Sequence, residues 1–214
     1  MSDETAARVE QIFTEAHAYR WGHFKLKSGL HADRYIEKFQ VLQWPERVTE
    51  LCRLMADRAW SPGGGSAVDV VIGPTTGGVI LAFEVARQLG LRGIFAEQVT
   101  AADGATRREL RRGFQIEQGE RVLLVDDVVT TGASLLEMVP LIEQSGGELV
   151  LAMVIIDRSG SLREITSPES GRSYPAEVLW SLTLPTYEPG EGSCPGCGAG
   201  LALEAPGSSG AVAG

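Results

Sequence analysis

The sequence lacks the features that direct a protein to a membrane or to an oxidising compartment. Its 214 residues contain only three cysteines, Cys52, Cys194 and Cys197, which is too few for a disulfide framework and is typical of a reducing cytoplasm. No apolar run approaches the roughly 20 residues that cross a bilayer. The acidic N-terminus carries no basic-then-apolar export signal. We therefore expect a cytoplasmic protein without a membrane partner.

Basic charge is also scarce. The chain has 19 Lys and Arg against 28 Asp and Glu, a formal net charge of -9. Nucleic-acid binders normally carry a basic face that neutralises phosphates, so we expect no nucleic-acid partner. An acidic chain can still bind a small polyphosphate through backbone N–H groups, a metal ion and a local arginine cluster. The composition, 43% hydrophobic and 22% charged, is that of a globular protein.

Apolar periodicity indicates an α/β fold. Short apolar runs alternate with amphipathic helical stretches, which favours a mainly parallel sheet flanked by helices. The strands are expected at residues 69–72, 93–96, 121–125 and 149–156, with a late edge strand at 177–182. The helices are expected within residues 3–20, 45–59, 78–89 and 131–144. Pro140 lies inside the last of these, where it predicts a kink or an early end.

The glycine-rich stretch at residues 61–66 predicts a linker. We expect an N-terminal helix and a small hood at residues 1–60 and the α/β core at 67–184. Residues 185–214, rich in Gly, Pro, Ser and Ala, are expected to form a flexible tail that carries the CxxC pair.

Two adjacent acids, Asp126 and Asp127, follow the apolar strand 121–125, and a small-residue loop then leads into a helix. Ligands of open α/β sheets bind at the carboxyl ends of the strands. The loop, residues 130–134, offers hydroxyls, backbone N–H groups and the positive end of a helix to a phosphate. A purely structural acidic turn would leave both carboxylates without partners, so a ligand site is favoured.

The thirteen residues from Val122 to Ser134 resemble the diphosphate-sugar-binding motif of type I phosphoribosyltransferases. The resemblance implies a type I phosphoribosyltransferase-like fold and a site for 5-phosphoribosyl-1-diphosphate (PRPP). It implies that Asp126 and Asp127 are catalytic and hold the ribose hydroxyls. It further implies that the loop around the 5-phosphate, which we call the phosphate loop, uses residues Val128, Val129, Thr130, Thr131, Gly132, Ala133 and Ser134. A fixed ribose near negative charge suits an oxocarbenium-like transition state.

A second strand-to-helix loop spans residues 73–79 and is rich in glycine, which lets the backbone approach an anion. Beside the first motif it resembles the family's diphosphate loop, with PRPP contacts implied for Thr75, Thr76, Gly77 and Gly78. Many orotate phosphoribosyltransferases carry a lysine where this sequence has Gly77, so one diphosphate contact is missing or is supplied from elsewhere.

Residues 98–113 form a polar segment with an arginine cluster, namely Arg107, Arg108, Arg111 and Arg112. A solvated loop would explain any single arginine. For the cluster we favour a mobile lid that closes over the diphosphate and excludes water, with PRPP contacts from Arg107, Arg108 and Arg111. The segment resembles the lid of orotate phosphoribosyltransferases, although the basic residues of that family lie earlier, just after the preceding strand.

Residues 24–36 resemble the hood segment of orotate phosphoribosyltransferases. In this comparison Lys27 faces PRPP and is catalytic, and Tyr35 lies near the base. Arg158 matches the arginine that reads orotate, a planar anion suited to a guanidinium fork, and Thr130 also contacts the base. The resemblance implies Mg²⁺ held mainly through PRPP, without a direct protein ligand, and a homodimer in which each lid reaches the neighbouring site.

The sequence therefore predicts transfer of ribose 5-phosphate from PRPP to orotate in UMP synthesis. Two alternatives stay open: the same transfer to a purine base, and a regulator of the same fold that senses PRPP. His23 and His31 are interpreted as structural or solvent-facing. Cys194 and Cys197 form half of a zinc ribbon and at most a weak zinc site, because one CxxC pair supplies only two of four ligands within this chain; two such pairs across a dimer would supply four.

Overall fold

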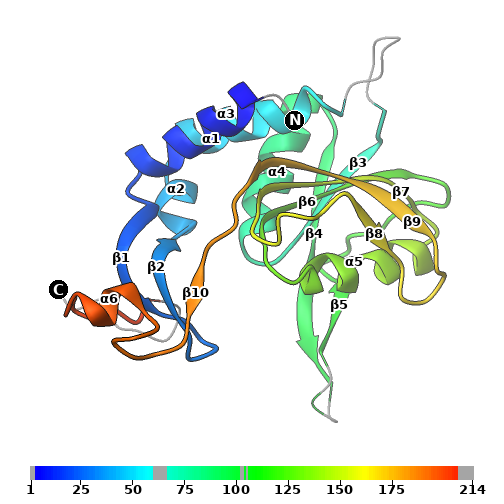
Figure 1. Cartoon of the computed structure of the whole chain (residues 1–214). Coiled ribbons are helices and arrows are strands. Elements are labelled where there is room, and N and C mark those ends of the chain that lie inside the picture. The colour runs from blue at the N-terminus through cyan, green and yellow to red at the C-terminus, as the bar shows by residue number, and fades with distance from the viewer. Residues whose placement is uncertain (1–2, 60–66, 102–103, 105, 207–214) are drawn as a thin grey trace.

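The computed structural model describes residues 3–59, 67–101, 104 and 106–206 (Figure 1). The linker predicted at residues 61–66 lies outside the described residues. Among those described, no helix is both long and apolar enough to cross a bilayer.

A seven-stranded sheet in the order β5-β4-β3-β6-β7-β9-β8 forms the centre of the described chain. Its five inner strands run parallel, and the two edge strands are antiparallel to their neighbours. The strands are β3 (Val70–Pro74), β4 (Arg92–Thr100), β5 (Thr106–Leu110), β6 (Arg121–Val129), β7 (Glu148–Asp157), β8 (Glu164–Thr166) and β9 (Ser173–Ser181). The predicted mainly parallel α/β fold is confirmed.

Helices cover both faces of this sheet (Figure 1). On one face lie α1 (Asp3–Glu15), α3 (Pro45–Ala56) and α4 (Gly77–Leu89), and on the other lies α5 (Ala133–Gln144). Successive strand residues point to opposite faces, so Leu123 packs under α1, α3 and α4 while Leu124 packs under α5. Burial on both faces explains the continuous apolar run of β6.

A second, three-stranded sheet lies beside the first (Figure 1), and we call it the hood sheet. It pairs β1 (Tyr19–Lys25) with β2 (His31–Ile36), and β2 with β10 (Thr186–Tyr187), all antiparallel. The short helices α2 (Phe39–Leu42) and α6 (Pro195–Gly198) follow β2 and β10 in the chain. The N-terminal segment therefore builds the hood sheet together with residues that follow the core.

Residues 185–206 are not the loose tail that their composition predicts. Beyond β10 and α6, the backbone of Glu204 pairs with β1: Lys25 N donates to Glu204 O at 2.7 Å, and Glu204 N donates to His23 O at 2.8 Å. Arg20 adds an ion pair to the Glu204 carboxylate at 2.6 Å. The backbone groups of β1 and β2 need partners, and this segment supplies them.

Three other predictions differ from the structure. The edge strand expected at residues 177–182 is the inner strand β9, because β8 pairs along its outer side. The lid segment is largely a hairpin, since β5 pairs antiparallel with β4. The early end expected at Pro140 does not occur, because helix α5 continues to Gln144, and the buried side chains of Met138 and Ile142 on either side offset the hydrogen bond that proline removes. The alternative of a kink stays a prediction.

Candidate active site

Strand β6 carries the two acids to the carboxyl end of the sheet, where both are buried. Asp126 Oδ2 accepts a hydrogen bond from Ser134 Oγ at 2.7 Å. Asp127 Oδ1 accepts one from Lys38 Nζ at 2.8 Å, and the two side chains form an ion pair. Asp127 Oδ2 is buried without a hydrogen-bond partner among the described residues. The pair therefore keeps unused acceptor capacity at the place where a ligand binds in this fold class.

Burial raises the pKa of Asp126 above its ordinary value. The neighbouring negative charge of Asp127 raises this pKa further, while the hydrogen bond from Ser134 opposes the shift. The folded chain thus holds Asp126 in an environment that disfavours its charged form until a cation or a donor arrives.

Gly77 begins α4 and lies directly against Asp127. A Cβ at position 77 would lie 1.6 Å from Asp127 Oδ2, so no larger residue fits while that carboxylate keeps its place. This contact gives a physical reason for glycine where many orotate enzymes have lysine. A cation is nevertheless present, because Lys38 reaches the same carboxylate from the hood side. Lys38 was missed by the sequence analysis, since no spacing or motif relates it to β6.

The phosphate loop, residues 130–134, connects β6 to α5. Gly132 has a φ of 79° and forms the N-terminal cap of α5, a conformation that glycine adopts without strain. Thr130 and Thr131 are exposed, and Ser134 is committed to Asp126. Val128 lines the adjacent cavity, whereas the Val129 side chain packs in the core. Only the backbone of Val129 is thus available to a ligand.

A cavity of about 610 Å³ opens between the hood side and the carboxyl ends of the core strands. Its lining brings together the predicted residues Lys27, Tyr35, Thr76, Thr130 and Arg158, and it adds Lys38. Three cations therefore face one cavity, with Glu37 as the acidic lining residue. Such a lining favours an anion with a planar or apolar body.

Arg158 follows β7 and is half-buried. Burial lowers the pKa of Arg158, and its Nε is buried without a hydrogen-bond partner among the described residues. The backbone around it is held in place, since Asp157 accepts hydrogen bonds from Ser159 and Leu162 and Arg158 N donates to Val129 O at 2.8 Å. A half-buried guanidinium beside a cavity, with a donor that no described residue accepts from, is suited to a carboxylate.

The hairpin β4–β5 divides the predicted lid arginines into two groups. Arg108 is nearly buried; it bonds Glu137 on α5 at 3.0 Å and reaches Thr75 O and Oγ1, each at 3.3 Å. Arg107 and Arg111 are exposed and both pair with Glu109. The structure thus joins Arg108 to the diphosphate loop, which includes Gly78, although none of these three arginines lines the cavity.

Residues 39–177 match the family model described as phosphoribosyl transferase domain. The fold and the buried acid pair beside a phosphate loop define a chain of this transferase class. Within the class, it is 42% identical over 198 residues to an orotate phosphoribosyltransferase of Caldicellulosiruptor saccharolyticus, covering 92% of this chain and 94% of that relative. Identity to the enzyme of Caldanaerobacter subterraneus is 41%, covering 94% and 96%. The chain belongs to the orotate phosphoribosyltransferase family.

Solved structures agree on the fold. The orotate phosphoribosyltransferase of Aeropyrum pernix superposes with a TM-score of 0.62 at 22% identity, over 81% of this chain and 93% of that one. Adenine phosphoribosyltransferase from Trypanosoma brucei gives 0.59 at 18% identity, over 81% and 78%. The fold alone is thus shared by enzymes named for a pyrimidine and for a purine base.

The contact between Gly77 and Asp127 predicts that Gly77→Ala destabilises the fold. The added Cβ must displace the Asp127 carboxylate from Lys38, which should lower the free energy of unfolding by about 1–3 kcal/mol. Urea unfolding measures this change. Gly192→Ala is the control, since no atom of the described residues lies within 4 Å of its Cβ position, and it should change stability by less than about 0.5 kcal/mol. Equal stability of the two variants would contradict the contact.

The raised pKa of Asp126 predicts a pH-dependent gain in stability for Asp126→Asn. Below the unfolded pKa, about 3.9, the carboxyl is neutral in both states and no penalty exists. As pH rises through the folded pKa, about 6, the wild type alone acquires a buried charge, so the variant should become relatively more stable by on the order of 1–2 kcal/mol. Urea unfolding of both proteins at pH 4 and pH 7 tests this; a difference that shrinks with pH would refute it.

Proposed function

We propose that the chain transfers ribose 5-phosphate from PRPP to orotate, giving orotidine 5′-monophosphate and diphosphate, a step in UMP synthesis. The observation that carries this proposal is Arg158, a half-buried guanidinium that lines a cavity beside the acid pair and whose Nε has no hydrogen-bond partner among the described residues. Orotate is a planar carboxylate, and its geometry matches the guanidinium fork. Tyr35 and Thr130 line the same cavity and would contact the ring.

The remaining site residues fit the parts of PRPP. Asp126 and Asp127 would accept hydrogen bonds from the ribose hydroxyls, and the phosphate loop would hold the 5-phosphate at the N-terminus of α5. The diphosphate would lie against residues 75–78 and Arg108, with Lys27 and Lys38 facing it from the hood side. During transfer the C1–O bond to diphosphate breaks and a C1–N bond to orotate forms. The two carboxylates favour the positive charge that develops at C1.

This chemistry needs no general base in the protein. Orotate arrives with its carboxylate ionised and a proton on the reacting nitrogen; as the C1–N bond forms, the N–H bond breaks and the proton passes to the diphosphate leaving group. The chain has to align this nitrogen with C1 and exclude water. Mg²⁺, when bound with PRPP, would neutralise charge on the diphosphate leaving group. The residues fit an ion that is held mainly through PRPP, since the acid pair places negative charge beside the cavity and Asp127 Oδ2 has no hydrogen-bond partner among the described residues.

We also propose a cytoplasmic homodimer in which the lid of one subunit reaches the site of the other. Arg107 and Arg111 do not line the cavity of their own chain. A surface hollow of about 420 Å³ lies between α3 and α4 and is lined by apolar side chains, including Phe83, which is 69% exposed. A second copy of the chain would cover this patch. Sedimentation equilibrium should give twice the chain mass, and a monomer at micromolar concentration would refute the dimer.

The first experiment is the loss of orotate absorbance in the ultraviolet, measured with PRPP and Mg²⁺ present and then with each omitted. Turnover that requires both supports the proposal. Turnover of a purine base but not of orotate would replace it by the purine alternative, in which Arg158 has no carboxylate to bind. Binding of PRPP without turnover of any base would favour the regulator.

Substitution of Arg158 predicts a selective loss of orotate binding. Arg158→Ala should raise KM for orotate about 10- to 100-fold, because a charge-assisted hydrogen bond contributes about 1.5–3 kcal/mol, while KM for PRPP changes little. Arg158→Lys should recover only part of the loss, since an ammonium cannot form the bidentate pair. Steady-state kinetics measure both constants, with Arg163→Ala, an exposed arginine after the same strand, as the control. A parallel rise in both KM values would count against the assignment.

A further inference from the structure

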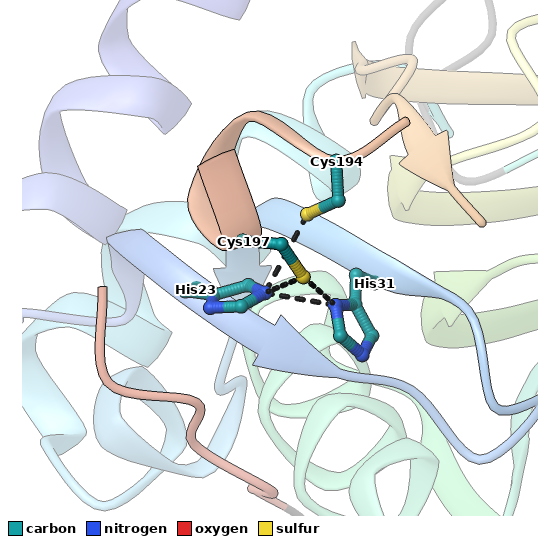
Figure 2. Close-up of side chains that lie close together, drawn as sticks. All are labelled: His23, His31, Cys194 and Cys197. Carbon is teal, nitrogen blue, oxygen red and sulfur yellow. Dashed lines mark hydrogen bonds between the residues drawn. The ribbon is translucent and has the colours of Figure 1, made fainter. Parts of the chain in front are cut away.

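Four potential metal ligands meet at one end of the hood sheet (Figure 2). His23 lies on β1, His31 begins β2, and Cys194 and Cys197 come from the turn of α6. Their ligand atoms all lie within 4.8 Å of one another, and His23, His31 and Cys194 are at most 5% exposed. The sequence interpretation that the CxxC pair has only two ligands in this chain is therefore wrong, because folding adds two histidines from more than 160 residues away.

The spacing of these atoms matches a tetrahedral site. With Zn–S of about 2.3 Å and Zn–N of about 2.0–2.1 Å, adjacent sulfur and nitrogen ligands of a tetrahedron lie about 3.5–3.6 Å apart. His23 Nε2 lies 3.5 Å from Cys194 Sγ and 3.5 Å from Cys197 Sγ, and Cys197 Sγ lies 3.3 Å from His31 Nδ1. The two nitrogens are 2.8 Å apart, closer than in a tetrahedron, and a modest outward shift of one ring would seat an ion.

Hydrogen bonds alone do not account for this arrangement. His23 Nε2 lies within 3.5 Å of three polar atoms, yet a ring nitrogen has either one proton or one lone pair to offer. His23 Nδ1 is directed at Leu201 O at 2.9 Å, which assigns the proton to Nδ1 and leaves the Nε2 lone pair directed at the cluster. A carbonyl on the far nitrogen is the usual device that orients a metal-ligating histidine.

The surrounding backbone is shaped around the same residues. The pairing of β1 with β2 shifts register between Trp21 and Phe24, which marks a bulge at the position of His23. A Cβ at Gly196 would lie 2.5 Å from His23 Cγ, so the turn between the two cysteines packs on the imidazole only with glycine. The bulge in β1 and the glycine in the CxxC turn thus allow His23 to lie close to the two cysteines.

We propose that His23 Nε2, His31 Nδ1, Cys194 Sγ and Cys197 Sγ bind one Zn²⁺ in a closed, structural site. Four protein ligands leave no open position for water or substrate, which distinguishes a structural zinc site from a catalytic one. Two thiolates and two imidazoles in a tetrahedron favour zinc over Mg²⁺ or Ca²⁺, which prefer oxygen. This ion is therefore separate from the Mg²⁺ of the proposed transfer reaction.

The zinc joins residues 194–197 to the two strands that carry the hood side of the cavity. The turn between those strands contains Lys27, and β2 contains Tyr35, both of which line the cavity. The hood sheet is small, and its third strand has only two residues. A metal that cross-links it supplies the stability that so few strands cannot provide.

The decisive experiment is the metal content of the full chain, purified without a histidine tag and measured by inductively coupled plasma mass spectrometry. About one zinc per chain is expected for the wild type, and less than about one tenth of this for Cys194→Ala and for His31→Ala. Cys52→Ala is the matched control and should keep its zinc. Cys52 lies in the core away from the cluster, and burial raises the pKa of its thiol so that it does not form the ligating thiolate.

Two further measurements apply to the wild type, so the test does not depend on the variants folding. Titration of the thiols with a mercurial reagent should release one zinc as Cys194 and Cys197 react, detected with a chromogenic chelator. Replacement of zinc by Co²⁺ should give the visible bands of a tetrahedral ion and a thiolate charge-transfer band. Wild-type protein that neither contains zinc nor takes up Zn²⁺ or Co²⁺ would overturn the proposal, as would full zinc content in Cys194→Ala.

The zinc site also predicts a kinetic effect, which is separable from the metal content. Removal of zinc should lower the thermal unfolding midpoint and raise KM for the ligands that contact Lys27 and Tyr35. The metal stoichiometry stands whether or not orotate is the acceptor, so failure of the transfer assay and failure of zinc binding are distinguishable. Unchanged stability after complete zinc release would overturn the structural role.

Discussion

The Asp127 carboxylate joins three segments that are distant in the chain. It lies near the end of β6, accepts a hydrogen bond from the Lys38 ammonium at 2.8 Å, and occupies the space that a side chain at position 77 would fill. A charge removed from water in this way needs a partner close by, because an unpaired buried carboxylate destabilises the fold by several kcal/mol. The position of the hood side, the start of α4 and the end of β6 therefore depend on one another, and the cavity exists only when all three are in place.

The parts of the molecule that the sequence predicts are those whose signal is local. An apolar run, two acids and a small-residue loop stand next to one another between Val122 and Ser134, and the structure places them on a central strand, at its end and at the start of a helix. The diphosphate loop is predictable for the same reason, because its residues are adjacent in the sequence and lie between a strand and a helix. Arg158 lies just after a parallel neighbour of β6, so parallel pairing alone brings it to the same edge of the sheet. Its role in reading orotate stays a prediction.

The parts that the sequence does not predict are set by distant partners. Residues 106–110 are polar and rich in arginine, and they form a strand because the edge of β4 offers hydrogen bonds. The composition of residues 185–206 is typical of a flexible tail, yet unpaired groups of β1 and β2 hold them in place. Lys38 and the two histidines carry no motif of their own. Each of them contacts a partner residue 89 to 174 positions away in the chain, and the spacing of residues in the sequence does not reveal such a contact.

The return of the chain from β9 to the hood sheet has a consequence for the order of folding. Contacts within the parallel sheet close loops of moderate length, whereas the contact between His23 and Cys194 closes a loop of 171 residues. Loop closure over such a distance carries a large entropy penalty unless the intervening chain is already compact. We therefore expect the core sheet to form before β10 pairs with β2 and before the segment that contains Glu204 pairs with β1. An early compact intermediate would possess the acid pair and the phosphate loop before residues 194–197 reach His23 and His31, so the sugar-phosphate side of the site would form before the hood sheet is complete.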